Sequence, residues 1–322
     1  YKEWQQDILS DYARRVQNLF HRLAPNMVYF NPAGQVYRSE SGTPFTTWEY
    51  WTYHGTENTK KVLGSRKDQM AGDTYNYLLG MDYRHTATSP NVGRIFLTEH
   101  MLNGAGPGIY FIGHLENQLD RVAIPGIKEI FAFHKKHEKL FTNVQSVAKI
   151  GLIMGDDRDY RGIMRMLTEE HLMYDLIYAK DIVSRKLPRD LDSYEVLILS
   201  HVTYLGDHQA SLLDTYVENG GRLLLTGFSG TSNGAVELEC LGVHTGYELY
   251  PRAMSTYLQV SDKDRNALGS KELKNFDVIM MNSDFLKCQP KKNAISYFNL
   301  VPNTMHGPPE KCYFTEDQVT AF

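Results

Sequence analysis

The chain has 322 residues, of which 42% are hydrophobic and 22% are charged, and its net charge is −4. These values are typical of a folded globular protein and argue against a disordered or fibrous chain, while the interspersed charges argue against a nucleic-acid partner. No apolar run approaches the roughly 20 residues that a bilayer-spanning helix needs, so we expect no membrane partner.

A chain of this length exceeds what one hydrophobic core usually supports, so two domains are expected. The three cysteines, Cys240, Cys288 and Cys312, are odd in number and widely spaced. This pattern fits neither a zinc site nor a disulfide scaffold, and it favours a reducing, cytoplasmic compartment over a secreted one. Tyr1 lies inside an expected amphipathic helix without an initiator methionine, so the chain resembles an internal piece of a longer protein and the compartment stays open.

In the first half, apolar residues recur at helical spacing from Ile8 to Leu23, which predicts a helix that ends before Pro25. A short buried strand is expected at 27–30, followed by a loop over 32–44 and an aromatic run over 48–53 near another strand end. The remaining predicted elements are a helix at 59–77, a strand at 77–81, a helix at 95–103, a strand at 109–112 and a helix at 127–141.

The alternation is more regular after Lys149. Strands are predicted at 150–154, 174–178, 194–199 and 222–226, with helices at 160–171 and 207–219. Further strands are expected near 257–260, 276–280 and 294–298. Short apolar strands that alternate with helices imply a parallel sheet covered on both faces, so the predicted fold class is α/β.

Ligands of βα folds gather at the carboxyl ends of the strands, because the loops there converge on one rim. In the first half, polar and aromatic residues are expected together at these ends. Aromatic rings beside polar groups suit sugars, which stack through C–H faces and hydrogen-bond through hydroxyls. The predicted substrate-binding residues are Asn31, Trp48, Trp51, His54, His85 and His114.

Glycoside cleavage needs one carboxyl group to protonate the leaving oxygen and a second to attack or to activate water. Glu49 is flanked by two aromatic residues, where burial would raise its pKa toward that of a general acid. Asp82 is the second catalytic candidate and Glu40 is an alternative, and a structural or substrate-positioning role for Glu49 stays open. Glu99 is expected on a helix, in a buried hydrogen bond.

The sequence predicts no metal and no cofactor. His54, His85 and His114 lie on separate segments without the spacing of a zinc site. In the second half, Ser229 follows a predicted strand, but its surroundings lack the GxSxG spacing of a nucleophile elbow. The acidic run at 156–159 is interrupted by an arginine, so it is interpreted as a solvated or helix-capping loop.

Four segments of the second half resemble the trimerisation domain of β-galactosidases: 160–162, 174–177, 194–199 and 217–223. That domain is similar to class I glutamine amidotransferases but lacks their nucleophile, and no cysteine stands at the expected turn here. The resemblance implies a doubly wound, flavodoxin-like domain over 146–322 and a homo-oligomer.

Upstream, segments 26–31, 80–82, 103–106 and 125–140 look like the last strands and helix of the (β/α)8 barrel that precedes this domain in glycosidases, including bacterial α-L-fucosidases. The resemblance implies that residues 1–145 form the C-terminal half of such a barrel, with the nucleophile upstream of Tyr1. The implied function is a retaining glycoside hydrolase acting on a fucoside, a galactoside or a related sugar.

Two alternatives stay open. The first is a non-catalytic carbohydrate-binding or assembly protein derived from a glycosidase. The second is a small-molecule enzyme that uses the second domain in amidotransferase fashion.

Overall fold

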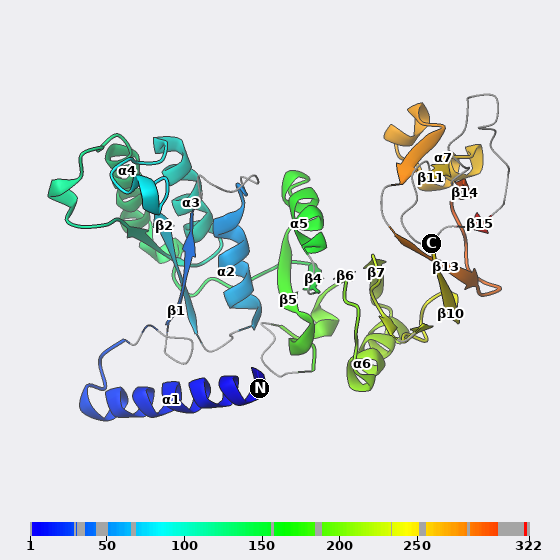
Figure 1. The fold of residues 1–322 in the computed structure, drawn as a ribbon, viewed down its shortest axis with the longest axis horizontal. Helices are drawn as coiled ribbons and strands as arrows, with labels where there is room; N and C mark the ends of the chain where they lie inside the picture. The colour runs from blue at the N-terminus through cyan, green and yellow to red at the C-terminus, as the bar shows by residue number, and fades with distance from the viewer. Residues whose placement is uncertain are drawn as a thin grey trace. The chain divides into compact units, whose positions relative to one another are not determined.

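The computed structural model (Figure 1) describes residues 2–28, 30, 36–42, 51–65, 69–155, 158–183, 189–232, 234–250, 256–281, 284–301 and 319–320. The chain forms two compact units, of which the first comprises Tyr1–Leu152 and Ile163–Tyr194 and the second comprises Ile153–Gly162 and Glu195–Phe322. The predicted domain boundary between residues 145 and 146 stays a prediction. The fold is mixed α/β with parallel sheets, as predicted for the class.

A three-stranded parallel sheet, in the order β1-β2-β3, lies at the centre of the first unit. Its strands are β1 (Val36–Ser41), β2 (Met70–Asn76) and β3 (Gly106–Tyr110). Helix α2 (His54–Ser65) connects β1 to β2, α3 (Pro90–Leu102) connects β2 to β3, and α4 (Ile124–Lys136) follows β3. Because the strands are parallel, the loops after β1, β2 and β3 all leave from the same edge of the sheet.

The core of this unit lies between β2 and the helices α3 and α4. Tyr75 of β2 is fully buried, and its ring centroid lies 6.2 Å from that of Phe96 on α3. Leu97 and Ile127 complete the contact between the two helices. A Cβ at Gly93 would lie 3.1 Å from the Tyr75 ring, so this glycine allows α3 to approach the strand closely.

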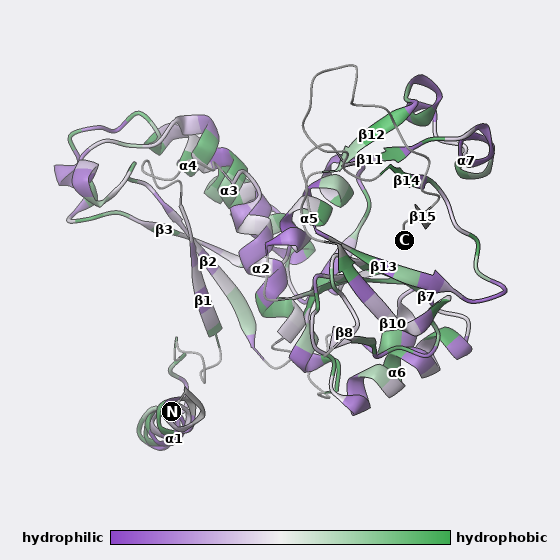
Figure 2. Cartoon of the chain, turned by 45° about the vertical axis from the view of Figure 1, so that its right-hand side comes forward, coloured by the Kyte–Doolittle hydropathy of each residue, from purple (hydrophilic) through white to green (hydrophobic). Residues whose placement is uncertain are grey.

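The first 42 residues confirm one prediction and contradict two. Helix α1 (Lys2–Leu23) ends before Pro25, as predicted, and Figure 2 shows both hydrophilic and hydrophobic residues along it. The strand predicted at 27–30 is wrong for its described residues, because Met27 and Val28 are half exposed and unpaired and Phe30 forms an isolated bridge with Val36. The loop predicted over 32–44 is wrong in its middle, where 36–41 form β1.

The helix predicted over 59–77 is correct only as far as Ser65, where α2 ends. Residues 70–76 are β2, which pairs with β1 on one side and β3 on the other, and such pairing outweighs weak local helix propensity. The strand predicted at 77–81 is also wrong, since β2 already ends at Asn76. The helices predicted at 95–103 and 127–141 correspond to α3 and α4, and the strand predicted at 109–112 overlaps the end of β3.

The regular elements predicted after Lys149 are confirmed. They are β4 (Ile150–Met154), α5 (Asp159–Glu169), β5 (Tyr174–Tyr178), β6 (Val196–Ser200), α6 (Asp207–Glu218) and β7 (Arg222–Thr226). The strands form one sheet in the order β5-β4-β6-β7. Their short, almost fully apolar sequences are typical of strands covered on both faces.

The remainder of the second unit is mainly antiparallel. One sheet has the order β13-β10-β9-β8, with β8 (Thr231–Ser232), β9 (Ala235–Val236), β10 (Val243–Tyr250) and β13 (Phe285–Pro290). The other has the order β12-β11-β14-β15, with β11 (Thr256–Gln259), β12 (Val278–Met281), β14 (Asn299–Val301) and β15 (Val319–Thr320).

The sequence located two of these antiparallel strands. The predictions at 257–260 and 276–280 correspond to β11 and β12, whereas the strand predicted at 294–298 is wrong, because β14 begins at Asn299. A short helix, α7 (Asp262–Leu268), lies between β11 and β12. Within the described ranges, no helix is long and apolar enough to cross a membrane.

Candidate functional site

The loops after β2 and β3 carry three of the predicted site residues. Asp82 lies in a short 3-10 helix, η1 (Met81–Tyr83), and His85 follows it in the same loop. His114 lies just before a second 3-10 turn, η2 (Leu115–Asn117), after β3. All three side chains are exposed at the C-terminal edge of the parallel sheet. Three further predicted residues lie outside the described residues: Asn31, Trp48 and Glu49.

Asp120 joins these two loops. Its Oδ2 accepts the Ala87 N–H at 3.0 Å, and its carbonyl oxygen accepts the Tyr77 hydroxyl at 2.6 Å. Burial, and secondarily the charge of Asp120, raise the pKa of Tyr77, so this hydroxyl stays a proton donor at neutral pH. The loop that carries Asp82 and His85 is therefore fixed against the loop that carries His114.

The ring of His54, another predicted sugar contact, lies against the backbone of Gly42. Its Nδ1 is 3.3 Å from the Gly42 nitrogen and 3.2 Å from the Gly42 carbonyl oxygen. Nδ1 accepts from the N–H in one tautomer and donates to the carbonyl in the other, so only one of these bonds forms at a time. Either bond holds the start of α2 beside the end of β1 and brings together the two ends of the segment 43–53. A sugar contact by His54 stays a prediction and would fall to Nε2.

Trp51, the remaining predicted sugar contact, lies near the C-terminal end of the segment 43–53. Its ring meets Tyr53 edge-to-face, with centroids 5.4 Å apart. The Tyr53 hydroxyl in turn donates to Glu169 at 3.3 Å. Trp51 and Tyr53 thus contact each other, and a role of Trp51 in stacking on a sugar stays a prediction.

Behind this edge lies a buried polar cluster of three side chains, Ser41, Asp73 and His100. The Ser41 hydroxyl donates to Asp73 Oδ2 at 2.5 Å, and His100 Nε2 lies 3.0 Å from the same oxygen and 3.2 Å from the hydroxyl. None of the three is more than 1% exposed. The cluster joins the end of β1, the middle of β2 and the third turn of α3.

The same three residue types form nucleophilic triads elsewhere, but their arrangement differs here. In a triad the histidine lies between the serine and the acid. Here both the Ser41 hydroxyl and His100 Nε2 lie within hydrogen-bond distance of the Asp73 carboxylate. The Ser41 hydroxyl is directed to a carboxylate and is closed to solvent. We therefore assign the cluster a structural role, which is to fix the end of β1 from which the segment 43–53 leaves.

Glu99 extends this cluster toward the first turn of α2. Its Oε2 accepts the Thr56 N–H at 3.0 Å, and a Cβ at Gly55 would lie only 2.8 Å from the same oxygen. Burial raises the pKa of Glu99 to about 7, against the lowering effect of the Thr56 and Gly55 N–H groups. Glu99 lies on a helix, as predicted, and its hydrogen bond to Thr56 is partly buried.

The face of the sheet that points away from this cluster is more open. Arg38 and Glu40 of β1 lie on it, with side chains 46% and 54% exposed, and their charged groups are 3.7 Å apart. Arg38 Nε also donates to Thr74 Oγ1 on β2 at 2.9 Å. Glu40 is therefore a carboxylate on the accessible face, one residue before β1 ends. Its catalytic role stays an alternative to that of Glu49.

In the second unit, polar side chains close the ends of the parallel strands. Asp159 Oδ2 accepts the hydroxyls of Ser200 at 3.1 Å and Thr226 at 2.8 Å. Ser229 accepts the Val202 N–H at 3.0 Å, and its hydroxyl lies 2.7 Å from the Thr226 carbonyl oxygen. These hydrogen bonds give Ser229 and Thr226, at the turn after β7, a structural role. No group of three His, Cys, Asp or Glu in the described ranges is placed to hold a metal ion.

Sequence reasoning did not single out Ser41, Asp73 or His100. It assigned residues 59–77 to one helix, so Asp73 was not recognised as a strand residue. No clean alternation marks this strand, because residues 71, 73, 74 and 75 are all buried. Gly72, within the proposed helix, was a local indication against it.

No protein-family model and no curated protein matches the sequence. Solved structures are similar: α-L-fucosidase isoenzyme 2 from Paenibacillus thiaminolyticus gives a TM-score of 0.69 at 16% identity, over 98% of this chain and 48% of that chain. A GH42 β-galactosidase from G. stearothermophilus gives 0.63 at 12% identity, over 91% and 51%, and a catalytic mutant of it gives 0.60 at 13% identity, over 83% and 43%.

The chain spans about half the length of these proteins. At such low identity the likeness concerns the fold alone. The chain thus has a fold similar to that of parts of a fucosidase and a β-galactosidase.

Proposed function

We propose that the chain belongs to a retaining glycoside hydrolase that acts on a fucoside, a galactoside or a related sugar. The observation that carries the proposal is the likeness to an α-L-fucosidase over 98% of the chain. The parallel sheet of the first unit adds support, because its C-terminal edge combines acidic, imidazole and aromatic side chains, the groups that sugar sites use.

We further propose that residues 1–145 form the C-terminal half of a (β/α)8 barrel and that residues 146–322 form an amidotransferase-like trimerisation domain. Three consecutive parallel strands with helical connections, β1 to β3, support the first part. The alternation of strands and helical segments from β4 to β7 supports the second.

In this proposal Glu49 is the general acid/base. The segment that contains it begins at Gly42 and ends at His54, whose ring contacts the Gly42 backbone. The end of β1 is in turn fixed by the bond from Ser41 to Asp73. A catalytic carboxyl must be held to within a fraction of an ångström, so fixed residues on both sides of the segment are a suitable support. Asp82 is the second carboxylate candidate.

The test of Glu49 uses the natural full-length polypeptide and two aryl glycosides that differ in leaving group. A general acid matters most when the leaving group is poor, so Glu49→Gln should lower kcat by about 10²–10⁴ with a poor leaving group and much less with dinitrophenolate. Glu116→Gln, in the exposed turn η2, is the matched control and should keep both rates. Equal losses on both substrates would indicate a structural role, and unchanged rates would remove Glu49 from the mechanism.

The substrate class is tested with aryl α-L-fucoside and aryl β-D-galactoside. Turnover of one of them with retention of anomeric configuration, followed by proton NMR of the first product, is expected. Inversion would contradict the retaining mechanism. Sugar binding without turnover of any glycoside would favour the carbohydrate-binding alternative.

We also propose that the second unit mediates homo-oligomer contacts. Two edge strands of its sheets carry exposed apolar side chains, namely Leu224 on β7, 52% exposed, and Val278 and Met280 on β12, 44% and 73% exposed. Exposed apolar edge strands are prone to pairing with another chain. Light scattering at micromolar concentration should show an oligomer that Leu224→Glu or Met280→Glu weakens, and a monomeric parent protein would refute the proposal.

A further inference from the structure

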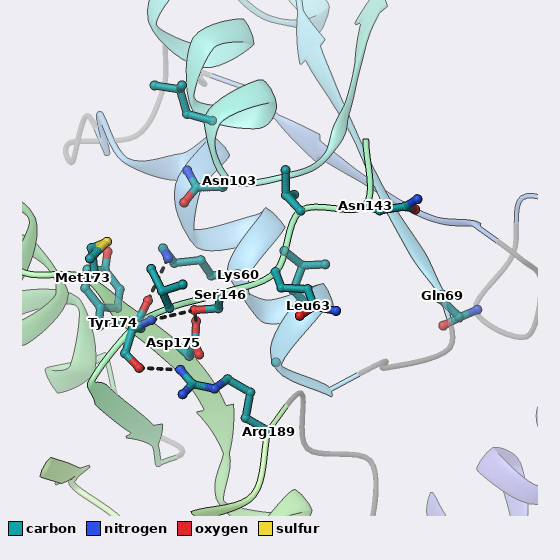
Figure 3. Close-up of a pocket in the computed structure, with 16 residues that line it drawn as sticks. Lys60, Leu63, Gln69, Asn103, Asn143, Ser146, Met173, Tyr174, Asp175 and Arg189 are labelled. Atoms are coloured by element: carbon teal, nitrogen blue, oxygen red, sulfur yellow. Dashed lines mark hydrogen bonds between the residues drawn. The ribbon is translucent and has the colours of Figure 1, made fainter. Parts of the chain in front are cut away.

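A cavity of about 790 Å³ (Figure 3) lies within the first unit. Its wall residues place it at the end of the sheet opposite the predicted sugar site. Its wall includes the last turn of α2, Gln69 just before β2, and Asn103 just after α3. These positions precede the N-terminal ends of β2 and β3, whereas Asp82, His85 and His114 follow the C-terminal ends. The cavity is therefore separate from the proposed active site.

Lys60 of α2 brings a buried ammonium group to this cavity. Its Nζ donates to the Tyr174 carbonyl oxygen at 2.7 Å and lies 4.9 Å from the centre of the Tyr174 ring. Both partners are uncharged, and within the described ranges Lys60 forms no ion pair. Burial lowers the pKa of Lys60, and the charge of Asp175 opposes this only in part. A buried cation with neutral partners is costly, so a bound anion would be favoured here.

The other charged groups of the wall leave the local balance positive. Arg189 donates to the carbonyl oxygens of Ala148 at 2.5 Å and Ser193 at 3.4 Å, again neutral partners. The Asp175 carboxylate accepts hydroxyl groups from Ser146 at 2.6 Å and from Tyr194 at 2.9 Å. Figure 3 shows Lys60 and Arg189 on either side of the segment that contains Tyr174 and Asp175. Two cations thus face one carboxylate whose oxygens already accept hydrogen bonds.

The rest of the wall offers amide groups and apolar surface. The amides can bond to hydroxyl groups, and the apolar side chains can contact C–H groups. The volume lies within the range of small-molecule sites. The amide residues are Gln69, Asn103, Asn143 and Gln145, and the apolar residues include Leu63, Leu102, Val144, Val147 and Met173.

We propose that this cavity binds a small hydroxylated carboxylate of sugar-acid size, with its carboxylate on Lys60 and its hydroxyl groups on the surrounding amides. Arg189 adds positive potential from the other side of the segment 173–175. The site is independent of the proposed glycosidase activity, because it uses none of the residues assigned to that activity.

The test is calorimetric titration of the full chain with D-glucuronate, with D-glucose as the neutral analogue and inorganic phosphate as the simple anion. Glucuronate should bind, glucose should bind at least 10-fold more weakly, and phosphate should bind more weakly than glucuronate. Equal affinity for glucose would overturn the role of the charge. Phosphate binding as tight as glucuronate binding would overturn the assignment of a hydroxylated carboxylate, and no glucuronate binding would overturn the site.

Substitutions in the cavity wall test whether glucuronate binds at Lys60. Lys60→Met keeps an unbranched side chain of nearly the same length but removes the ammonium group, and it should weaken glucuronate binding at least 10-fold. Asp175→Asn keeps one acceptor oxygen, and its NH2 can donate to the second hydroxyl, while the competing charge is removed. It should therefore tighten binding several-fold, a gain that a loss of folding cannot imitate. Lys128→Met, on the exposed side of α4, is the matched control and should leave affinity unchanged. Wild-type affinity in both Lys60→Met and Asp175→Asn would overturn the proposal.

Discussion

The imidazole of His100 and the carboxylate of Asp73 lie 3.0 Å apart, and neither side chain is accessible to solvent. The Ser41 hydroxyl donates to the same carboxylate oxygen, so His100 Nε2 is best assigned as the protonated nitrogen that donates to Asp73. This arrangement leaves Nδ1 without a hydrogen-bond partner among the described residues. The pair links α3 to β2, and its acid is the acceptor on which both neighbours depend.

Removing Asp73 should therefore be strongly destabilising. Asp73→Ala removes the acceptor shared by the Ser41 hydroxyl, His100 Nε2 and the Thr74 N–H, all of them buried, and we expect the free energy of unfolding to fall by about 3 to 5 kcal/mol. All three tryptophans lie in the first unit, so urea unfolding followed by tryptophan fluorescence reports on the relevant part. Asp82→Ala removes an exposed carboxylate from the neighbouring loop and should change the free energy by about 0.5 kcal/mol or less. Comparable effects of the two substitutions would contradict the assigned role of the cluster.

Glu99 predicts a pH dependence of stability. Burial raises its pKa from 4.5 to about 7, so between these values the folded chain retains a proton that the unfolded chain has lost. The contribution of this group to stability therefore falls as pH rises through that window. Glu99→Gln keeps an oxygen for the Thr56 N–H and does not ionise. Its stability relative to wild type should rise by up to about 3 kcal/mol from pH 4.5 to pH 7.

Urea unfolding of both proteins across this pH range measures the difference. Glu116→Gln, in an exposed turn, removes a carboxylate without burial and should follow the wild-type curve. A constant difference between Glu99→Gln and wild type at all pH values would show that Glu99 does not titrate in this window.

The sequence predicted the second half of the chain better than the first, for a physical reason. Strands β4 and β7 are short, mainly apolar runs bounded by polar residues or glycine, so their limits are visible locally. In contrast, β1 reads Val-Tyr-Arg-Ser-Glu-Ser, and four of its six residues are polar. Its strand conformation depends on pairing with β2, which is 34 residues further along the chain. Such non-local pairing has no local signature.

The candidate site was predictable in its general position but not in its supporting contacts. Placing His114 after a strand required only the alternation of strand and helix, whereas Asp82 was placed after a strand at 77–81 and in fact follows β2, which ends at Asn76. The bond between His54 and Gly42, and the cluster around Asp73, depend on which residues of distant segments face each other. Residues 70–76 show no clean period-two pattern, because 73, 74 and 75 are all buried, so their strand conformation follows only from pairing with the neighbouring strands.

Asp120 is predicted to control the mobility of two loops. Asp120→Ala removes the acceptor for the Ala87 N–H and the Val122 N–H, while the bond from the Tyr77 hydroxyl to the backbone carbonyl can persist. We expect a loss of about 1 to 2 kcal/mol and faster hydrogen exchange in the loop 77–88. Asp120→Asn keeps one acceptor oxygen and should show a smaller effect. Unchanged exchange at Ala87 in Asp120→Ala would show that other contacts hold the two loops together.

Two glycines of the second unit should respond in opposite directions to the same substitution. A Cβ at Gly155, just after β4, would lie 2.0 Å from the His201 carbonyl oxygen, so Gly155→Ala forces the backbone apart and should cost about 3 kcal/mol or more. Gly162 lies at an exposed position of α5, and a Cβ there would meet no atom within 4 Å. Gly162→Ala should therefore stabilise the unit by about 0.5 to 1 kcal/mol.

Hydrogen exchange of the β6 and β7 amides measures both effects, since the tryptophans report on the other unit. Faster exchange in Gly155→Ala and equal or slower exchange in Gly162→Ala are expected. Both variants add one methyl group, so a general effect of the methyl group cannot stabilise one variant and destabilise the other. Similar exchange in the two variants would show that the end of β4 can move away from His201, and would contradict the close contact between these two strand ends.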